Sequence, residues 1–118
     1  MTRQITIHSF ADVDRSGKVR WTACELGYEI EERRLKLGEQ LAPDYLALNP
    51  YAQVPTAAFD GKCYIESTAV CQILAEKHPE AGLIPQERRA REHFHQIVNL
   101  ATTTLEQPLV SYALARAG

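Results

Sequence analysis

Residues 49–67, NPYAQVPTAAFDGKCYIES, combine a proline, a tight-turn dipeptide and an acid–hydroxyl pair within one short stretch. Glu66 and Ser67 stand just before an apolar helical pattern, where free backbone N–H groups and the helix dipole favour an anion. Serine and acidic residues at a helix start also act as ordinary N-caps, which stabilise the helix without any ligand. The stretch therefore predicts either a plain hairpin with a capped helix, or a backbone surface that holds a ligand.

The elements that would position this stretch follow from hydrophobic periodicity and turn residues. Alternating, β-rich patterns predict strands over 4–10, 29–36, 56–59 and 62–65, with a type I′ turn at Asp60-Gly61. Helical spacing predicts helices over 16–26, 43–48, 68–77 and 86–107, the last one kinked or ended by Pro108. Breaker residues over 79–85 predict a linker. This order predicts an α/β fold, a mixed four-stranded sheet with helices on its faces.

Composition is that of an ordinary globular protein. The 118 residues are 45% apolar and 24% charged, with a formal net charge of −2. Because there is no basic block and no long apolar run, we expect neither a nucleic-acid partner nor a membrane span. The amino-terminal residues lack the apolar core of a signal peptide, which predicts a cytoplasmic protein.

Cysteine and histidine spacing gives no sign of a metal site. The three cysteines, Cys24, Cys63 and Cys71, form no C-x-x-C motif, and we expect them to be small buried side chains. His93 and His95 are two residues apart on a predicted helix, so their rings point to different faces. No metal is therefore expected.

The order of elements, together with NPYAQVPTAAFDGKCYIESTAVCQILAEKHP, resembles the thioredoxin-like N-terminal domain of soluble glutathione transferases. N-P-x-x-Q-V-P, a D-G hairpin and E-S opening a helix are specific as a combination. The resemblance implies a thioredoxin-like βαβ-ββα domain over residues 1–80. It further implies that residues 86–118 are the start of an all-α second domain, represented here by its first helix.

The resemblance implies that the chain binds glutathione as a co-substrate, with the Val54–Pro55 bond as the centre of the site. In this family that bond is expected to be cis, an isomer essentially confined to X-Pro bonds. The N–H and C=O of Val54 would then face outward and pair with the cysteinyl part of glutathione, as an added strand does. The alternative is a trans proline that starts an edge strand.

Four further side chains are implied as glutathione ligands. Ser67 would bind the γ-glutamyl carboxylate through its hydroxyl and its N–H, while Glu66 would face the ammonium group. Gln53 precedes the binding backbone, and Gln40 lies in the loop that often contacts the glycine carboxylate. Each glutamine has the alternative role of a solvated polar residue.

Activation of the glutathione thiol needs a group that stabilises the thiolate. Family members use a tyrosine at the end of the first strand, where this chain has Ser9, or a hydroxyl or thiol in the following loop. Counting back from Lys18 places Val13 at the loop position, and valine donates no hydrogen bond. The remaining candidate is Ser16 at the expected start of the first helix, with a simple N-cap as its alternative. Arg15 is a nearby charge that would assist a thiolate, or an ordinary exposed arginine.

The implied function is that of a glutathione transferase, a homodimer whose bound thiolate attacks a small hydrophobic electrophile. A non-catalytic glutathione-binding or protein-assembly module with the same fold is the alternative, favoured by Val13 and by the short helical part. Glutathione-dependent thiol–disulfide exchange is a third interpretation. It ranks last because Cys24 lies deep in the first predicted helix.

Overall fold

The computed structural model describes residues 2–10 and 14–118, so the interpretation of Val13 lies outside the described residues. The chain divides into two compact units, Met1–Ala81 and Gly82–Gly118. The helices of the described part do not combine the length and the apolar character needed to cross a membrane.

A mixed four-stranded sheet forms the centre of the first unit. Its strands are β1 (Gln4–Ser9), β2 (Glu29–Arg34), β3 (Thr56–Phe59) and β4 (Lys62–Tyr64), in the order β2-β1-β3-β4. β1 pairs with β2 in parallel and with β3 antiparallel, and β3 pairs with β4 antiparallel. Asp60 and Gly61 have φ angles of 51° and 74°, both left-handed, as a type I′ turn requires. The arrangement confirms the predicted fold class.

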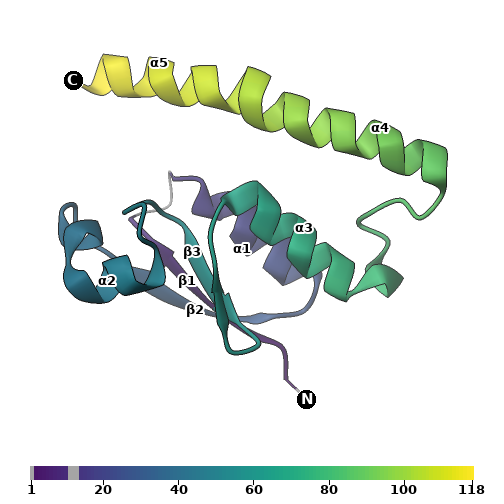
Figure 1. The fold of residues 1–118 in the computed structure, drawn as a ribbon, viewed down its shortest axis with the longest axis horizontal. Helices are drawn as coiled ribbons and strands as arrows, with labels where there is room; N and C mark the ends of the chain where they lie inside the picture. The colour runs from purple at the N-terminus through teal and green to yellow at the C-terminus, as the bar shows by residue number, and fades with distance from the viewer. Residues whose placement is uncertain (1, 11–13) are drawn as a thin grey trace. The chain divides into compact units, whose positions relative to one another are not determined.

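Helices α1 (Ser16–Glu25) and α3 (Ser67–Lys77) lie side by side against one face of the sheet (Figure 1). The core fills the space between them and the strands, and its fully buried side chains include Ile5, Ile7, Val19, Val70 and Leu74. The spacing of Val19, Ala23 and Leu26 along one stripe explains why this face of α1 turns inward.

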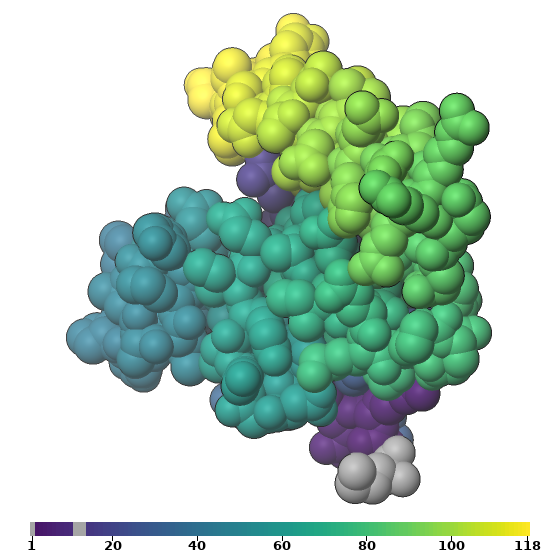
Figure 2. All heavy atoms as spheres, turned by 45° about the vertical axis from the view of Figure 1, so that its right-hand side comes forward, coloured from purple at the N-terminus to yellow at the C-terminus, as the bar shows by residue number. Residues whose placement is uncertain are grey.

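Helix α2 (Pro43–Leu48), which follows the short 3₁₀ turn η1 (Glu39–Leu41), contacts the opposite face of the sheet. His8 neighbours Ile7 on β1 and therefore points to the other face. Its ring meets the Tyr45 ring of α2 edge-on, with centroids 5.8 Å apart. In the space-filling view, the blue surface of α2 adjoins the teal surface of the β3–β4 hairpin (Figure 2).

The second unit is one continuous helical segment, preceded by the short turn η2 (Pro79–Ala81) at the end of the first. It consists of α4 (Arg88–Asn99), the π-helical stretch η3 (Leu100–Glu106) and α5 (Gln107–Ala117). The Glu87 carboxylate caps α4 by accepting the N–H of Arg89 at 2.9 Å and of Ala90 at 2.8 Å.

The prediction that the helix spans residues 86–107 was wrong in its bounds, and the alternative that Pro108 ends it was also wrong. The helix begins at Arg88 and continues past Pro108 to Ala117. Pro108 lies in the first turn of α5, directly after the π-helical stretch. The i→i+5 pairing of a π-helix changes the local hydrogen-bond pattern, so the missing proline N–H is accommodated there.

The expectation of buried cysteines was wrong for two of the three. Cys24 and Cys63 are exposed, and Cys71 is half-buried. Cys24 lies beside the inward stripe of α1, one residue after Ala23. Cys63 lies opposite Ala58 in the β3–β4 register, on the face of the sheet that α1 and α3 leave open.

Leu74→Ala should lower the free energy of unfolding by about 2–5 kcal/mol, because the side chain is fully buried in the core and its loss leaves a cavity. Urea unfolding followed by circular dichroism measures this. Leu37→Ala is the matched control, since Leu37 is 87% exposed and its loss should change stability by less than about 0.5 kcal/mol. Equal losses in the two variants would contradict the assigned core.

Candidate functional site

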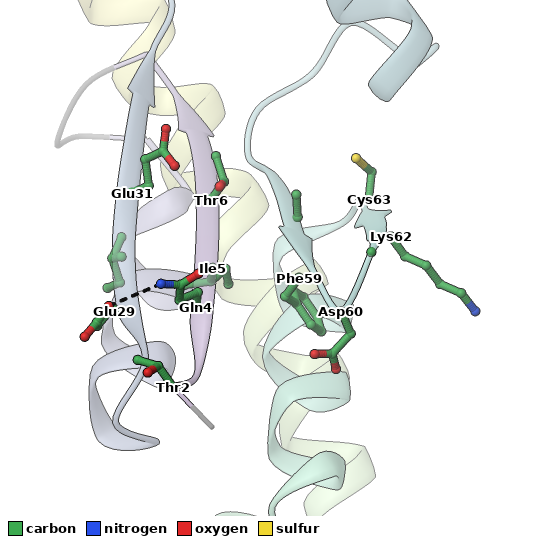
Figure 3. A pocket seen from close by; sticks show the side chains of 13 residues that line it. Thr2, Gln4, Ile5, Thr6, Glu29, Glu31, Phe59, Asp60, Lys62 and Cys63 are labelled. Atoms are coloured by element: carbon green, nitrogen blue, oxygen red, sulfur yellow. Dashed lines mark hydrogen bonds between the residues drawn. The ribbon is translucent and has the colours of Figure 1, made fainter.

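A cavity of about 730 Å³ opens on the sheet face that α1 and α3 leave uncovered. Thr6, Glu29 and Glu31 stand on one side of it, and Phe59 and Cys63 belong to the hairpin on the other side (Figure 3). The residues that the sequence predicts for glutathione do not line this cavity. Within the described ranges, His, Cys, Asp and Glu side chains nowhere gather in a group of three that would hold a metal ion.

A smaller cavity, of about 110 Å³, brings together most of the predicted site residues. Its walls come from the loop before β3, from the start of α3 and from the residue before α1. Five predicted ligands line it: Gln53, Val54, Pro55, Glu66 and Ser67. Arg15, Asn49, Tyr51 and Ile65 complete the described lining. The Val54–Pro55 peptide bond in its wall is cis.

The start of α3 forms one wall of this smaller cavity. Glu66 is the N-cap residue, with φ 67° and ψ 102°, and its side chain makes no capping hydrogen bond. Such left-handed backbone is uncommon for a residue other than glycine and clusters at functional sites. Ser67 is the first helical residue, and its side chain is buried, with 6% exposed. It is therefore not the N-cap residue that a purely stabilising role at the helix start would require. The first turn of α3 therefore keeps N–H groups that no N-cap side chain satisfies.

The loop that carries Val54 is held by a partly buried hydrogen-bond network. The Tyr45 hydroxyl donates to the C=O of Gln53 at 2.5 Å and lies 2.6 Å from the Thr56 hydroxyl. The Asn49 amide donates to the same C=O at 3.1 Å and to Thr56 at 3.2 Å. Asn49 is 1% exposed, so this network is shielded from water. It fixes the backbone just before Val54.

Burial also shifts the ionisation of the two rings beneath this loop. Burial raises the pKa of Tyr45, while its hydrogen bond with Thr56 acts in the opposite direction. Burial and the Arg33 guanidinium lower the pKa of His8. Both shifts favour the neutral forms, so the network stays uncharged at neutral pH.

Sequence reasoning did not single out Tyr45, Asn49 or Thr56 as functional. Asn49 belongs to the N-P motif, and its place directly after an apolar helix turn is the signal that favours its burial. An asparagine side chain also caps a local turn here, because its Oδ1 accepts the N–H of Tyr51 at 3.0 Å. For Tyr45, helical spacing is the only pattern in the sequence. That pattern does not reveal the hydrogen bond from its hydroxyl to the C=O of Gln53, eight residues further along the chain.

Ser16 lies at the start of α1 as expected, but it does not line the smaller cavity. It is fully buried, and its N–H donates to the Asp14 carboxylate at 2.8 Å. Its hydroxyl oxygen accepts a hydrogen bond from Arg20 at 3.1 Å. Ser9 is also fully buried, with its hydroxyl 3.5 Å from Glu32. Neither serine joins the predicted binding residues.

Gln40 also stands apart from the other predicted ligands. It lies in η1, where its Oε1 accepts the N–H of Gly38 at 2.7 Å, and it does not line the smaller cavity. Gln53 lines the cavity, and its own C=O is the atom held by Tyr45 and Asn49. The two glutamines therefore have different surroundings.

Comparisons with known proteins agree with this fold. The family described as "Glutathione S-transferase, N-terminal domain" matches residues 8–82. Glutathione S-transferase 1 of Dianthus caryophyllus is 31% identical over 115 residues, which cover 96% of this chain and 52% of that protein. Probable maleylacetoacetate isomerase 2 of Drosophila melanogaster is 36% identical over 87 residues, covering 72% of this chain and 38% of that protein.

A solved structure, Ure2p in complex with glutathione, superposes with a TM-score of 0.81 at 25% identity. The match covers 97% of this chain and 51% of that one. The chain thus spans about half the length of the Dianthus relative and of this structure, and less of the Drosophila relative.

Tyr45→Phe should cost about 1–3 kcal/mol in the free energy of unfolding, because it leaves the C=O of Gln53 and the buried Thr56 hydroxyl with one partner fewer. Urea denaturation provides the measurement. Tyr51→Phe serves as the control: Tyr51 is 70% exposed, so loss of its hydroxyl should leave stability nearly unchanged. If both variants unfold at the same urea concentration, the network does not hold the loop.

Proposed function

The chain belongs to the glutathione S-transferase family, by its N-terminal domain, and we propose that its first unit binds glutathione in the smaller cavity. The observation that carries the proposal is the convergence of Gln53, Val54, Glu66 and Ser67 on that cavity. These residues come from two separate parts of the chain, the loop before β3 and the start of α3. Similarity to a structure in complex with glutathione supports the same ligand.

The cysteinyl part of glutathione would pair with the backbone of Val54. β3 begins at Thr56, so the N–H and C=O of Val54 lie outside the sheet ladder. The hydrogen bonds among described residues leave both groups without a protein partner. An extended peptide laid along this loop would satisfy them, as in other cases of strand addition.

The γ-glutamyl end would lie at the start of α3. Its carboxylate would accept hydrogen bonds from the hydroxyl and N–H of Ser67, where the helix dipole favours negative charge. Glu66 would face the ammonium group, and Gln53 the glycyl end. A volume of about 110 Å³ is smaller than pockets that enclose a whole ligand, so part of the tripeptide would lie outside the cavity, with Gln40 as a further contact.

The proposed reaction is attack of the bound thiolate on a small apolar electrophile. Ser16 is the sequence-based candidate for stabilising the sulfur, and it stays a prediction because its buried hydroxyl lies outside the cavity lining. The homodimer and the cytoplasmic location are likewise parts of the proposal. The transferase name of the Dianthus relative favours this reaction class.

Two other functions have specific support. A non-catalytic glutathione-binding module would explain why neither Ser9 nor Ser16 reaches the cavity. Maleylacetoacetate isomerisation is suggested by the name of the Drosophila relative. Calorimetry with glutathione, followed by turnover assays with an aryl halide and with maleylacetoacetate, separates the three. Binding without either turnover would select the module.

Ser67→Ala should weaken glutathione binding about 10- to 100-fold, the range expected for losing a hydrogen bond to a charged group. Isothermal titration calorimetry on the 118-residue chain measures the dissociation constant. Ser111→Ala, at an exposed position of α5, should leave it unchanged. Unchanged affinity together with lower stability in Ser67→Ala would reduce Ser67 to a structural role.

Ser16→Ala should lower kcat for aryl-halide conjugation about tenfold or more if its hydroxyl stabilises the thiolate, because one charge-assisted hydrogen bond is lost. Glutathione affinity, measured in parallel, should change little, since Ser16 does not line the cavity. Turnover equal to that of the wild type would clear Ser16 of any catalytic part.

A further inference from the structure

His8 adjoins the hydrogen-bond network that holds the loop before β3. It is 8% exposed, and its ring meets the Tyr45 ring of α2 edge-on, with the ring centroids 5.8 Å apart. On β1 it pairs with Thr56 of β3 on one side and with Arg33 of β2 on the other. His8 therefore lies next to both residues that bring a hydroxyl to the network, Tyr45 and Thr56.

Two contacts connect the His8 ring to the N–H of Val54. The first is the ring contact with Tyr45, and the second is the hydrogen bond from the Tyr45 hydroxyl to the C=O of Gln53. This C=O and the N–H of Val54 belong to one planar trans peptide unit, so they point in opposite directions. A donor that fixes the C=O of Gln53 on one side therefore aims the N–H of Val54 to the other side.

The surroundings of His8 disfavour a proton on its ring. Burial lowers the pKa of His8 most and the Arg33 guanidinium lowers it further, while Glu31 acts in the opposite direction. The ionisable groups around the His8–Tyr45 pair are Arg33 and Glu31 of β2, Asp14 before α1 and Cys63 of β4. A protonated ring would be a cation beside a guanidinium, without the hydration that offsets its charge in water. The packing against Tyr45 thus favours a neutral ring.

We propose that His8 is a positioning residue: its neutral ring, packed against Tyr45, holds the N–H of Val54 in the direction that binds glutathione, and a proton on the ring releases it. His8 does not line the smaller cavity, so it acts through Tyr45 and not on the ligand. The inference rests on the proposed binding of glutathione, and it adds to that binding a dependence on pH.

The direction of the pH effect follows from the two states of the loop. In the released state the ring is hydrated, and its pKa returns toward the ordinary value of about 6.5. In the packed state, burial and Arg33 keep the pKa below that value. The packed state therefore has its full stability above about pH 6.5 and loses it as the pH falls toward the lowered pKa. The equilibrium constant for packing changes by at most about tenfold per pH unit.

Hydrogen exchange in the free protein tests the hold on the loop. Amides of α2 and of residues 49–53 should lose protection about threefold or more between about pH 7 and 5.5, after correction for the intrinsic exchange rate. His8→Phe keeps a ring against Tyr45 that cannot gain a proton, so its protection should change little. His93→Phe makes the same change at an exposed position of α4 and should keep the wild-type loss. Equal losses in the wild type and His8→Phe would overturn the proposal.

Calorimetry with S-methylglutathione tests the effect on binding. This ligand has no thiol to titrate, and its carboxylates and ammonium group keep their charges between about pH 5.5 and 7. The dissociation constant should rise about two- to tenfold from pH 7 to 5.5 in the wild type and in His93→Phe, and less in His8→Phe. A constant that rises by the same factor in the wild type and His8→Phe, or in neither, contradicts the inference.

His8→Gln, which also has a neutral side chain, replaces His8→Phe in both measurements if that variant fails to fold. A wild type that binds S-methylglutathione equally at both pH values overturns the role of His8 whatever the variants do. A wild type that fails to bind it at pH 7 would instead remove the proposed function.

Discussion

The position of the candidate site depends on one carbonyl that accepts two hydrogen bonds, the C=O of Gln53. It accepts hydrogen bonds from Tyr45 in α2 and from Asn49 just after it. Both hydrogen bonds are partly shielded from water, and losing either would remove part of what holds this carbonyl, so the two donors favour one loop conformation. Thr56 joins the same network and is also the β3 residue that pairs with His8 on β1. The loop is thereby tied to the sheet and to α2 at once.

The two helix starts near the smaller cavity are built in opposite ways. At α1, the Asp14 carboxylate satisfies a backbone N–H and offsets the local dipole. At α3, the N-cap residue Glu66 has left-handed backbone and provides no side-chain cap. A negative ligand is therefore favoured at the start of α3 by the helix itself, whereas at α1 the Asp14 carboxylate already meets the first N–H of the helix.

Local sequence signals predicted the elements well where a short pattern decides the structure. Asp60-Gly61 specified its turn because type I′ geometry needs two left-handed residues, and both are left-handed here. Pro43–Leu48 and Thr56–Phe59 have the predicted bounds. The prediction that Pro108 ends the helix was wrong, because the effect of a proline depends on the hydrogen-bond pattern of the preceding turn. Residue types do not reveal the π-helical stretch that precedes Pro108.

The site was only partly predictable for a similar reason. Glu66, Ser67 and Val54 belong to a contiguous motif, so the sequence brought them together. Arg15 lines the same cavity from a distant part of the chain. Tyr45 lies outside the cavity lining and acts through its hydrogen bond to the C=O of Gln53, which residue types alone do not reveal. The prediction that Cys24 is buried was wrong because this residue lies just outside the apolar stripe of α1. One residue further along a helix, the side chain points from the core toward the surface.

Binding and activation rest on separate elements, and this separation bears on how family membership should be interpreted. The groups proposed to hold the tripeptide lie on the loop before β3 and at the start of α3, fixed by Tyr45 and Asn49. Ser16, the candidate to act on the sulfur, begins α1 and does not line that cavity. Because none of the proposed binding residues lies in α1, a substitution of Ser16 is expected to lower turnover more than binding. Membership therefore argues for the ligand more directly than for the reaction.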